Sequence, residues 1–520
     1  MSQRFLHPVW FCVLALLSLT GCMPDLDPED RQVTLVIAKA FAPLSLDPAV
    51  YATGNDYPVH ELVYEQLLSI DLEAADGVGP ELARSWAFSE SGHAITLELE
   101  EGHTFESGAP VDAEAVRYSL MRVKQVGRWS SGYTEWLDEV EVLAPYRVRL
   151  HLKRPYRPAL QLLAHSATSI VDPSVVAPHE GEDLGIGFLS EDSAGSGPYR
   201  LLEKTVDGTV ILTPNPQSPP PQTFTRIEFR PIPDEGVRRL LLERGDIDFT
   251  DIVPSAFLER YRAIESVNAI TGAGGSSVSY LTLNTRSGVF SDIRLRQAAH
   301  AAIDYHGLRE LVLKGNAIQL PGYLTPYAAG YDDKELPPSR NLEKAARLLS
   351  EAGYDGAPVE FITSQIGPVG EFIQSNLKEA GFNVQIVRRD LGSIDSLKRK
   401  GDFDLIYEGW LTDSPDPSSM LEALFASQNI DTGLNASGYQ DPETDRLIDA
   451  LLSEADPERR RRLQRQIDQR LRQKRPVVML FSALPIAAYR DDIEGLSINP
   501  VKPYFHPFHE MTRTMDTDRP

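Results

Sequence analysis

The sequence predicts an α/β protein divided into two or three lobes. Its 520 residues are too many for a single hydrophobic core. Between Leu342 and Trp410, helix-like and strand-like segments alternate, and their caps and glycine stops agree with that alternation. The first part of the chain instead mixes short alternating strands with helices and has no such rhythm. One lobe is therefore expected to be α/β with a mainly parallel sheet.

The composition is that of an ordinary globular protein with an acidic surface. Hydrophobic residues make up 42% of the chain and charged residues 24%. The 51 lysines and arginines face 75 acidic residues, which gives a net charge of −24. Because such a surface repels nucleic acid and anionic lipid, both are excluded as partners.

The first 22 residues have the pattern of a bacterial lipoprotein signal peptide. Arg4 precedes the apolar run Val9–Leu19, which is too short for a stable membrane anchor. The run ends in Leu19-Thr20-Gly21-Cys22, which resembles a lipobox, whose cysteine receives diacylglycerol and becomes the new N-terminus. We expect Cys22 to be lipidated; an ordinary signal peptide with a chance cysteine is the alternative.

Removal of the signal peptide would leave Cys22 as the only cysteine, so no disulfide within the chain is expected. Residues 23–32 are polar and contain proline, which suits a short tether. No later segment approaches 18 uninterrupted apolar residues, so the body is expected to be soluble. The pattern predicts export and attachment to a membrane by lipid.

The expected elements of the first half follow from apolar spacing. They are, in order, a strand at 33–38, a helix at 59–68, a strand at 94–100, a helix at 112–123 and a strand at 146–152. Further on, a glycine-punctuated turn at 193–197 enters a strand. The strand Phe224–Ile232, the helix Asp234–Gly245 and the short strand Asp246–Thr250 resemble a βαβ unit.

The segment from Leu342 is more regular. Asn341 is expected to cap a helix that Gly353 ends. The remaining expected elements are a strand at 358–363, a helix at 369–380, a strand at 383–387, a short helix at 394–400 and a strand at 403–408. In open α/β sheets, ligands bind beyond the carboxyl ends of the strands.

Such a strand end is followed by the acidic loop GWLTDSPDPSSML, Gly409–Leu421. Asp416 and Pro417 are suited to begin the next helix, because aspartate caps free N–H groups and proline fits the first helical position. Asp413 has no such local role. It follows the carboxyl end of a strand, where a ligand could contact it. The alternative is a turn residue that only satisfies the loop backbone.

Other polar groups have ordinary explanations. The helix Asp456–Lys474 buries a stripe of Leu463, Ile467 and Leu471, which leaves the run Arg459–Arg462 mostly on solvated faces. His506 and His509 match no metal-binding spacing. The sequence has no nucleophile elbow, zincin motif, P-loop or dinucleotide fingerprint, and no placeable pair of catalytic carboxylates. We therefore predict no enzymatic activity, no cofactor and no metal site.

Several segments, in this order, resemble family 5 extracellular solute-binding proteins, the oligopeptide-, dipeptide- and nickel-binding group of bacterial ABC importers. They are Ser45–Leu68, Pro80–Val123, AGSGPYRLLE, GDIDFTD, Tyr280–Asp304, GWLTDSPDPSSML and YQDPETDRLIDALL. The resemblance implies a periplasmic-binding-protein-like fold of two hinged lobes, in its large three-domain variant. It implies a discontinuous domain I at 33–59, 189–275 and 487–520, a domain II at 60–188 and a domain III at 276–486.

The resemblance also implies a binding site. In peptide-binding members, an aspartate three residues after the tryptophan of this motif receives the ligand's amino group, and Trp410-Leu411-Thr412-Asp413 keeps that spacing. Backbone groups at Gly409–Leu411, facing those at Tyr51–Gly54, would bind an extended ligand as an added strand. The segment Ile362–Gly367 lacks the arginine that takes the free carboxylate in dipeptide-binding members.

The function expected from these features is that of a monomeric, lipid-anchored receptor in the periplasm or at the cell surface. It would bind a peptide-like or other small-molecule solute and deliver it to an ABC permease. The same fold binding an oligosaccharide, an opine or a metal chelate is one alternative. An envelope hydrolase, or a signalling or chaperone role without transport, are alternatives of other classes.

Overall fold

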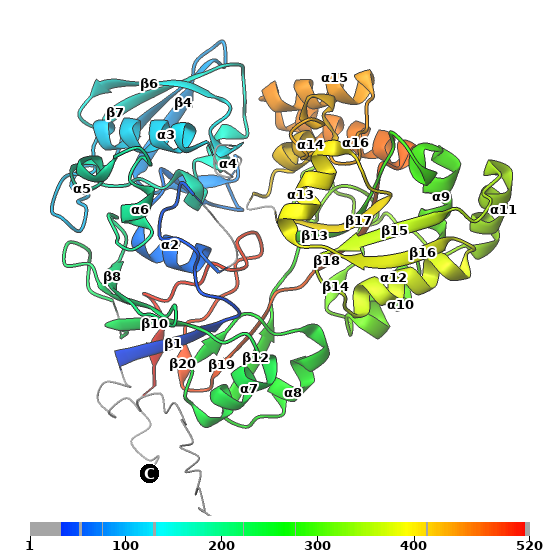
Figure 1. Cartoon of the computed structure of the whole chain (residues 1–520). Coiled ribbons are helices and arrows are strands. Elements are labelled where there is room, and N and C mark those ends of the chain that lie inside the picture. Colours follow the sequence, from blue (N-terminus) through cyan, green and yellow to red (C-terminus); the bar gives the residue numbers. More distant parts are fainter. Residues whose placement is uncertain are drawn as a thin grey trace, which may run out of the picture.

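A computed structural model of the protein describes residues 33–50, 55–74, 76–127, 132–221, 223–275, 277–411 and 414–514. These residues form three large sheets of seven, four and six strands and two small two-stranded sheets. In Figure 1 the seven- and four-stranded sheets lie on the left and the six-stranded sheet on the right. We call the former, with their helices, lobe A and the latter, with its helices, lobe B. None of the described helices combines the length and apolarity needed to cross a bilayer.

The seven-stranded sheet has the order β12-β19-β11-β1-β10-β9-β8. Its strands are β1 (Thr34–Lys39), β8 (Tyr199–Lys204), β9 (Val210–Pro214), β10 (Arg226–Pro231), β11 (Phe249–Thr250), β12 (Val267–Thr271) and β19 (Ile486–Arg490). β1 runs parallel to both β10 and β11, which α7 (Glu235–Arg244) connects, so the expected βαβ unit is present with β1 inserted. Alternate β1 side chains enter two separate cores, one with Leu35 and Ile37 and the other with Val36 and Ala38.

The four-stranded sheet of lobe A is antiparallel throughout, in the order β4-β5-β7-β6. Its strands are β4 (Ala83–Phe88), β5 (Ala94–Leu99), β6 (Leu137–Ala144) and β7 (Arg147–Leu152). α3 (Ala113–Val126) begins where Asp112 accepts hydrogen bonds from the N–H groups of Glu114 and Ala115. Lobe A also contains β2 (Leu68–Ile70), β3 (Val78–Pro80), β20 (Ile493–Glu494), β21 (Thr512–Arg513), α4 (Ala159–Leu162), α5 (Pro173–Val176), α6 (Ile186–Leu189) and α8 (Leu258–Arg262).

One predicted helix of lobe A is displaced. The helix expected at 59–68 is α2, Tyr57–Val63, and Tyr64 is already extended. Tertiary pairing explains the early end, because the Gln66 N–H donates to the Glu81 carboxylate at 3.0 Å and the Leu67 carbonyl accepts from the Ala83 N–H at 2.9 Å. These longer-range partners override the local helical pattern.

The six-stranded sheet of lobe B has the order β14-β18-β13-β17-β15-β16. Its strands are β13 (Ser277–Leu283), β14 (Ala317–Ile318), β15 (Pro358–Thr363), β16 (Asn383–Arg388), β17 (Leu405–Leu411) and β18 (Val477–Ala483). β15 is parallel to β16 and β17, as expected. β13 is antiparallel to β17 and β18, so the sheet as a whole is mixed rather than mainly parallel.

The helices of lobe B cover this sheet. They are α9 (Ile293–Ala302), α10 (Tyr305–Gly307), α11 (Leu342–Ala352), α12 (Pro368–Glu379), α13 (Leu391–Lys400), α14 (Ser418–Phe425), α15 (Pro442–Ser453) and α16 (Pro457–Lys474). The predicted caps of α11 are present: Asn341 accepts from the Lys344 N–H at 2.8 Å, and Gly353 ends the helix with a φ of 69°.

The chain crosses between the lobes twice, from β12 to β13 and from β18 to β19. The two crossings lie side by side, because the Gly272 N–H donates to the Pro485 carbonyl at 2.8 Å. A Cβ on Gly274 would lie 2.7 Å from the Ala483 carbonyl oxygen, so this approach requires glycine. Two short adjacent connections of this kind form a hinge.

The lobes also touch away from the hinge. One apolar core joins the four-stranded sheet of lobe A to α14, α15 and α16 of lobe B. At its margin, the Arg157 N–H donates to the Leu452 carbonyl at 2.7 Å. The Tyr156 hydroxyl donates to Glu422 at 2.9 Å, and Arg154 forms an ion pair with the same carboxylate.

Candidate functional site

The carboxyl-terminal end of β17 has an unpaired edge. All residues from Leu405 to Leu411 pair with β13 on one side. On the other side, β15 pairs only with Leu405 and Ile406. From Tyr407 onward, no strand among the described residues pairs with that second edge. Because backbone groups of a strand face its two edges alternately, this end offers donors and acceptors to an added chain.

The side chains at this end leave the edge accessible. Gly409 is exposed, and a Cβ there would meet only the Val278 carbonyl oxygen, at 3.4 Å. Trp410, which pairs with Val278, is half-buried and packs against the core shared by the two lobes. Leu411 is half-buried. These three predicted site residues therefore occupy one strand end.

The other predicted site residues, Asp413, Tyr51 and Gly54, and the predicted lipidation site Cys22 lie outside the described residues. The loop after β17 reaches lobe A, because a Cβ on Gly77 would lie 2.8 Å from Pro415. The strand end thus lies close in sequence to a point where the two lobes meet.

The helix after this loop begins as expected, with one difference. Asp416 accepts hydrogen bonds from the N–H and the hydroxyl of Ser418, at 2.9 and 2.5 Å, so it does satisfy the helix start. Pro417 occupies the cap position rather than the first helical position. The second oxygen of Asp416 forms an ion pair with Arg460.

Arg460 belongs to the arginine run assigned to the solvated faces of its helix. Its neighbours Arg459, Arg461 and Arg462 are exposed, whereas Arg460 is half-buried. It also donates to the carbonyls of Leu451 and Glu454, at 2.9 and 3.0 Å. Sequence periodicity could not single out this residue, because its partners come from the loop before α14, from α15 and from the residue that follows α15.

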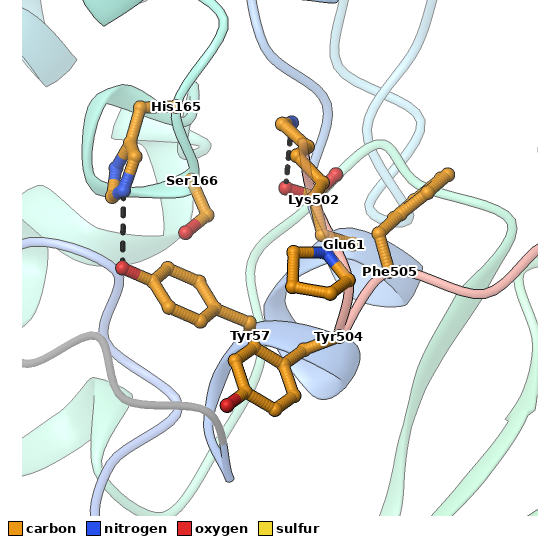
Figure 2. Close-up of a pocket in the computed structure, with 8 residues that line it drawn as sticks. Tyr57, Glu61, His165, Ser166, Lys502, Tyr504 and Phe505 are labelled. Carbon is orange, nitrogen blue, oxygen red and sulfur yellow. Dashed lines mark hydrogen bonds and ion pairs between the residues drawn. The ribbon is translucent and has the colours of Figure 1, made fainter. Parts of the chain in front are cut away.

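A narrow pocket lies in lobe A where α2, the segment after α4 and the C-terminal segment meet. Figure 2 shows its lining. The lining residues are Tyr57, Glu61, His165, Ser166, Lys502, Pro503, Tyr504 and Phe505. The free space is about 10 Å³, which is room for a single water molecule. In Figure 1 the red C-terminal segment that carries 502–505 lies beside α2 on the side toward lobe B.

Two interactions define the polarity of this pocket. The His165 Nδ1 accepts from the Ala167 N–H at 3.0 Å, so the proton of the neutral ring is on Nε2, which donates to the Tyr57 hydroxyl at 3.1 Å. Lys502 and Glu61 form an ion pair at 3.1 Å, and their side chains are 12% and 10% exposed. The two opposite charges that line the pocket therefore balance each other.

A buried ion pair lies beneath Tyr504. Lys39 ends β1 and Asp251 follows β11, so the parallel ends of these two strands bring the ammonium and the carboxylate to 2.6 Å. The Lys39 Nζ is 5.9 Å from the centre of the Tyr504 ring, and the His506 Nε2 is 3.4 Å from Asp251. Burial would raise the pKa of Asp251, but Lys39 and His506 outweigh it and hold the pKa at about 2.

Sequence reasoning missed this arrangement. Lys39 and Asp251 are 212 residues apart, and neither has a local spacing that predicts an ion pair. His506 was expected at the surface or in the core, and it is buried. No group of three or more histidine, cysteine, aspartate or glutamate side chains suited to hold a metal ion occurs in the part of the chain that the structure describes.

Residues 77–432 match the middle-region model of family 5 of the bacterial extracellular solute-binding proteins. The chain belongs to this family. The predicted family is thereby confirmed. Because the family consists of solute-binding proteins, its membership also supports the prediction that the chain is not an enzyme.

Curated relatives align along nearly the whole chain. The probable D,D-dipeptide-binding periplasmic protein DdpA of Escherichia coli (strain K12) is 30% identical over 91% of this chain and 92% of its own length. The glutathione-binding protein GsiB of the same strain is 26% identical over 94% of this chain and 96% of its own. Both alignments extend well beyond the region that the family model matches.

Solved structures confirm the predicted fold. DppA from Helicobacter pylori, in complex with the peptide STSA, superposes with a TM-score of 0.81 at 24% identity, over 93% of this chain and 99% of that one. NikA from Brucella suis, in complex with Fe(III)-EDTA, has a TM-score of 0.81 at 25% identity, over 92% and 100%. The family 5 solute-binding fold therefore extends over the described lobes.

Proposed function

We propose that this solute-binding protein is an exported, lipid-anchored receptor that binds a peptide-like solute between its lobes and delivers it to an ABC permease. The observation that carries the proposal is the unpaired edge at the end of β17, Tyr407–Leu411. Two relatives are named for binding a D,D-dipeptide and glutathione, and DppA from Helicobacter pylori was solved with the peptide STSA bound. These ligands support a peptide-like ligand for this protein.

The backbone of Gly409–Leu411 would bind an extended ligand by strand addition. A peptide has the alternating N–H and C=O groups that such an edge requires, and a rigid sugar or a metal ion does not. On the opposite side, the backbone of Tyr51–Gly54 would complete the binding. Trp410 and Leu411 would supply the apolar contacts beside it.

Asp413 would receive the ammonium group of the ligand. A carboxylate enclosed between two lobes loses water, and this loss is costly unless a cation meets it. Asp413 therefore favours ligands with a free amino group. Ligand binding would draw the lobes together about the two crossings that meet at Gly272 and Pro485.

Cys22 would carry the lipid, and the protein would function as a monomer in the periplasm or at the cell surface. Residues 23–32 would be its tether. Cys22→Ser should release the protein from the membrane fraction or leave unprocessed precursor. Unchanged membrane retention with normal processing would contradict lipidation at this residue.

The ligand class is best tested by native mass spectrometry of freshly purified protein, followed by calorimetry. We expect a co-purified small peptide, or binding of D-alanyl-D-alanine, glutathione or an L-dipeptide by the ligand-free protein. A co-purified oligosaccharide or metal chelate, with no binding of any of these three peptides, would contradict the peptide-like class.

A further inference from the structure

Ser166 has a buried hydroxyl without a hydrogen-bond partner. Its side chain lines the narrow pocket of lobe A, and the residue is 1% exposed. Its Oγ has no hydrogen-bond partner within the described structure. Most buried side-chain polar atoms have a partner, because an unsatisfied one carries an uncompensated desolvation cost. The hydroxyl is therefore positioned to bind a group that the chain itself does not provide.

Neighbouring hydroxyls in the same segment are satisfied. Thr168 donates to the Leu162 carbonyl at 2.7 Å. Ser169, also 1% exposed, accepts from the Gln66 side-chain amide at 3.0 Å. Buried hydroxyl groups of this segment therefore do form hydrogen bonds within the protein. Ser166 differs from Thr168 and Ser169 because its hydroxyl has no such partner.

The surroundings restrict what can bind there. In Figure 2 the Ser166 hydroxyl points toward the side of the pocket that Tyr57 occupies. The walls are mainly rings, and the charges of Lys502 and Glu61 balance each other. The free space of about 10 Å³ admits one oxygen-sized atom. A carbonyl or carboxylate oxygen has this size and projects about 1.2 Å from its carbon atom.

We propose that the Ser166 hydroxyl donates a hydrogen bond to a carbonyl or carboxylate oxygen of the bound ligand. This inference rests on the proposed function, since it takes the ligand to be peptide-like. It adds a contact on lobe A that is independent of the β17 edge on lobe B. The pocket would then fix the position of one oxygen along the ligand.

The test compares Ser166→Ala with Ser169→Ala, which removes a hydroxyl of equal burial that has a protein partner. In calorimetry with D-alanyl-D-alanine, glutathione and L-alanyl-L-alanine, Ser166→Ala should bind the accepted probe about 5- to 10-fold more weakly than wild type. Its melting temperature without ligand should be unchanged or higher, because an unsatisfied group is removed. Ser169→Ala should show the reverse, a lower melting temperature with unchanged affinity.

Either half of this result can fail by itself. If wild type binds a probe and Ser166→Ala binds it equally well, the inference is wrong while the proposed function stands. If wild type binds none of the probes and co-purifies with an oligosaccharide or metal chelate, the peptide-like class is wrong, and the inference about Ser166 is wrong with it. If Ser166→Ala lowers the melting temperature as much as Ser169→Ala does, the Ser166 hydroxyl is satisfied within the fold and the inference is wrong. A crystal structure with a water, instead of a ligand oxygen, on Ser166 Oγ would also overturn it.

Discussion

In the six-stranded sheet, the outer strand β16 and the end of β17 both have an unpaired edge among the described residues, and these two edges are built differently. β16 is the outermost strand, and its exposed side chains are the polar Asn383, Gln385 and Arg388. Gln374 of α12 also reaches the Val384 carbonyl at 3.2 Å. The free end of β17 instead has a bare glycine, Gly409, among half-buried residues.

The difference shows how an open edge arises inside an ordinary sheet. Long polar side chains and a covering amide protect β16 from unwanted strand addition, as is usual for edge strands. β17 becomes accessible because β15 stops pairing with it after Ile406. The proposed binding edge is therefore left open by the short pairing of its neighbour β15.

The largest effect is expected from the charge that follows the β17 edge. Asp413→Asn keeps the size of the side chain and removes the charge that would meet a ligand ammonium. Affinity should fall by roughly 30- to 5,000-fold, which corresponds to roughly 2–5 kcal/mol. Titration calorimetry measures this loss. An N-acetylated ligand serves as the control, since it should lose little further affinity in the variant; equal losses on acetylation in both proteins would mean that Asp413 does not meet the amine.

A side chain at Gly409 should block the edge without unfolding the sheet. In Gly409→Val the new Cβ meets only the Val278 carbonyl at 3.4 Å, so stability should hardly change. The branched side chain would stand on the face of the sheet, crowd the cross-strand side chain of an added ligand and weaken binding by about 10- to 100-fold. Gln385→Val on β16 is the matched control and should leave affinity unchanged. Comparable binding by Gly409→Val and wild type would place the ligand elsewhere.

The strand ends of lobe A provide a contrast, because Lys39 and Asp251 close them with a buried ion pair. The pKa of Asp251 is lowered to about 2 in the fold, so its contribution to stability is present above the unfolded value near 3.9 and lost as the pH falls through 2. The free energy of unfolding of wild type should exceed that of Asp251→Asn by about 2 kcal/mol at neutral pH. Denaturant unfolding should show this difference shrinking between about pH 4 and pH 2; a constant difference across that range would contradict the buried pair.

The smallest effect is expected where the lobes touch beside α14. Burial raises the pKa of Glu422, and the Arg154 guanidinium and the Tyr156 hydroxyl partly offset this rise. Because Arg154 is 38% exposed, Arg154→Gln should speed ligand dissociation only about 2- to 5-fold. Stopped-flow kinetics measures this rate. Arg446→Gln removes an exposed pair within α15 alone and should not change it; equal rates in all three proteins would show that the contact does not hold the lobes together.

Local patterns predicted the part of lobe B that leads to the site. Asn341 and Gly353 delimit α11, and the apolar runs locate β15, β16 and β17. The strand predicted at 403–408 is found at Leu405–Leu411, so Gly409–Leu411, expected to begin a loop, still belong to the strand because they pair with β13. The mixed pairing of the sheet was not predicted, because β13 ends 122 positions before β17 begins and nothing local indicates its direction.

The narrow pocket of lobe A could not be predicted from local patterns. It joins Tyr57, His165–Ser166 and Lys502–Phe505, which come together only through tertiary packing. The same holds for Lys39 and Asp251, which meet because two parallel strands end side by side. Spacing reveals groups on one helix or one strand, whereas these clusters depend on the order of strands within the sheet.

Amide hydrogen exchange along β17 tests the central claim, that a ligand adds to its free edge, most directly. Exchange is measured in wild type with and without a saturating peptide ligand identified by calorimetry. Amides within Tyr407–Leu411 should become protected, while those of the outer strand β16, Asn383–Arg388, should exchange as before. Unchanged exchange at Tyr407–Leu411 in the saturated protein would contradict strand addition at this edge.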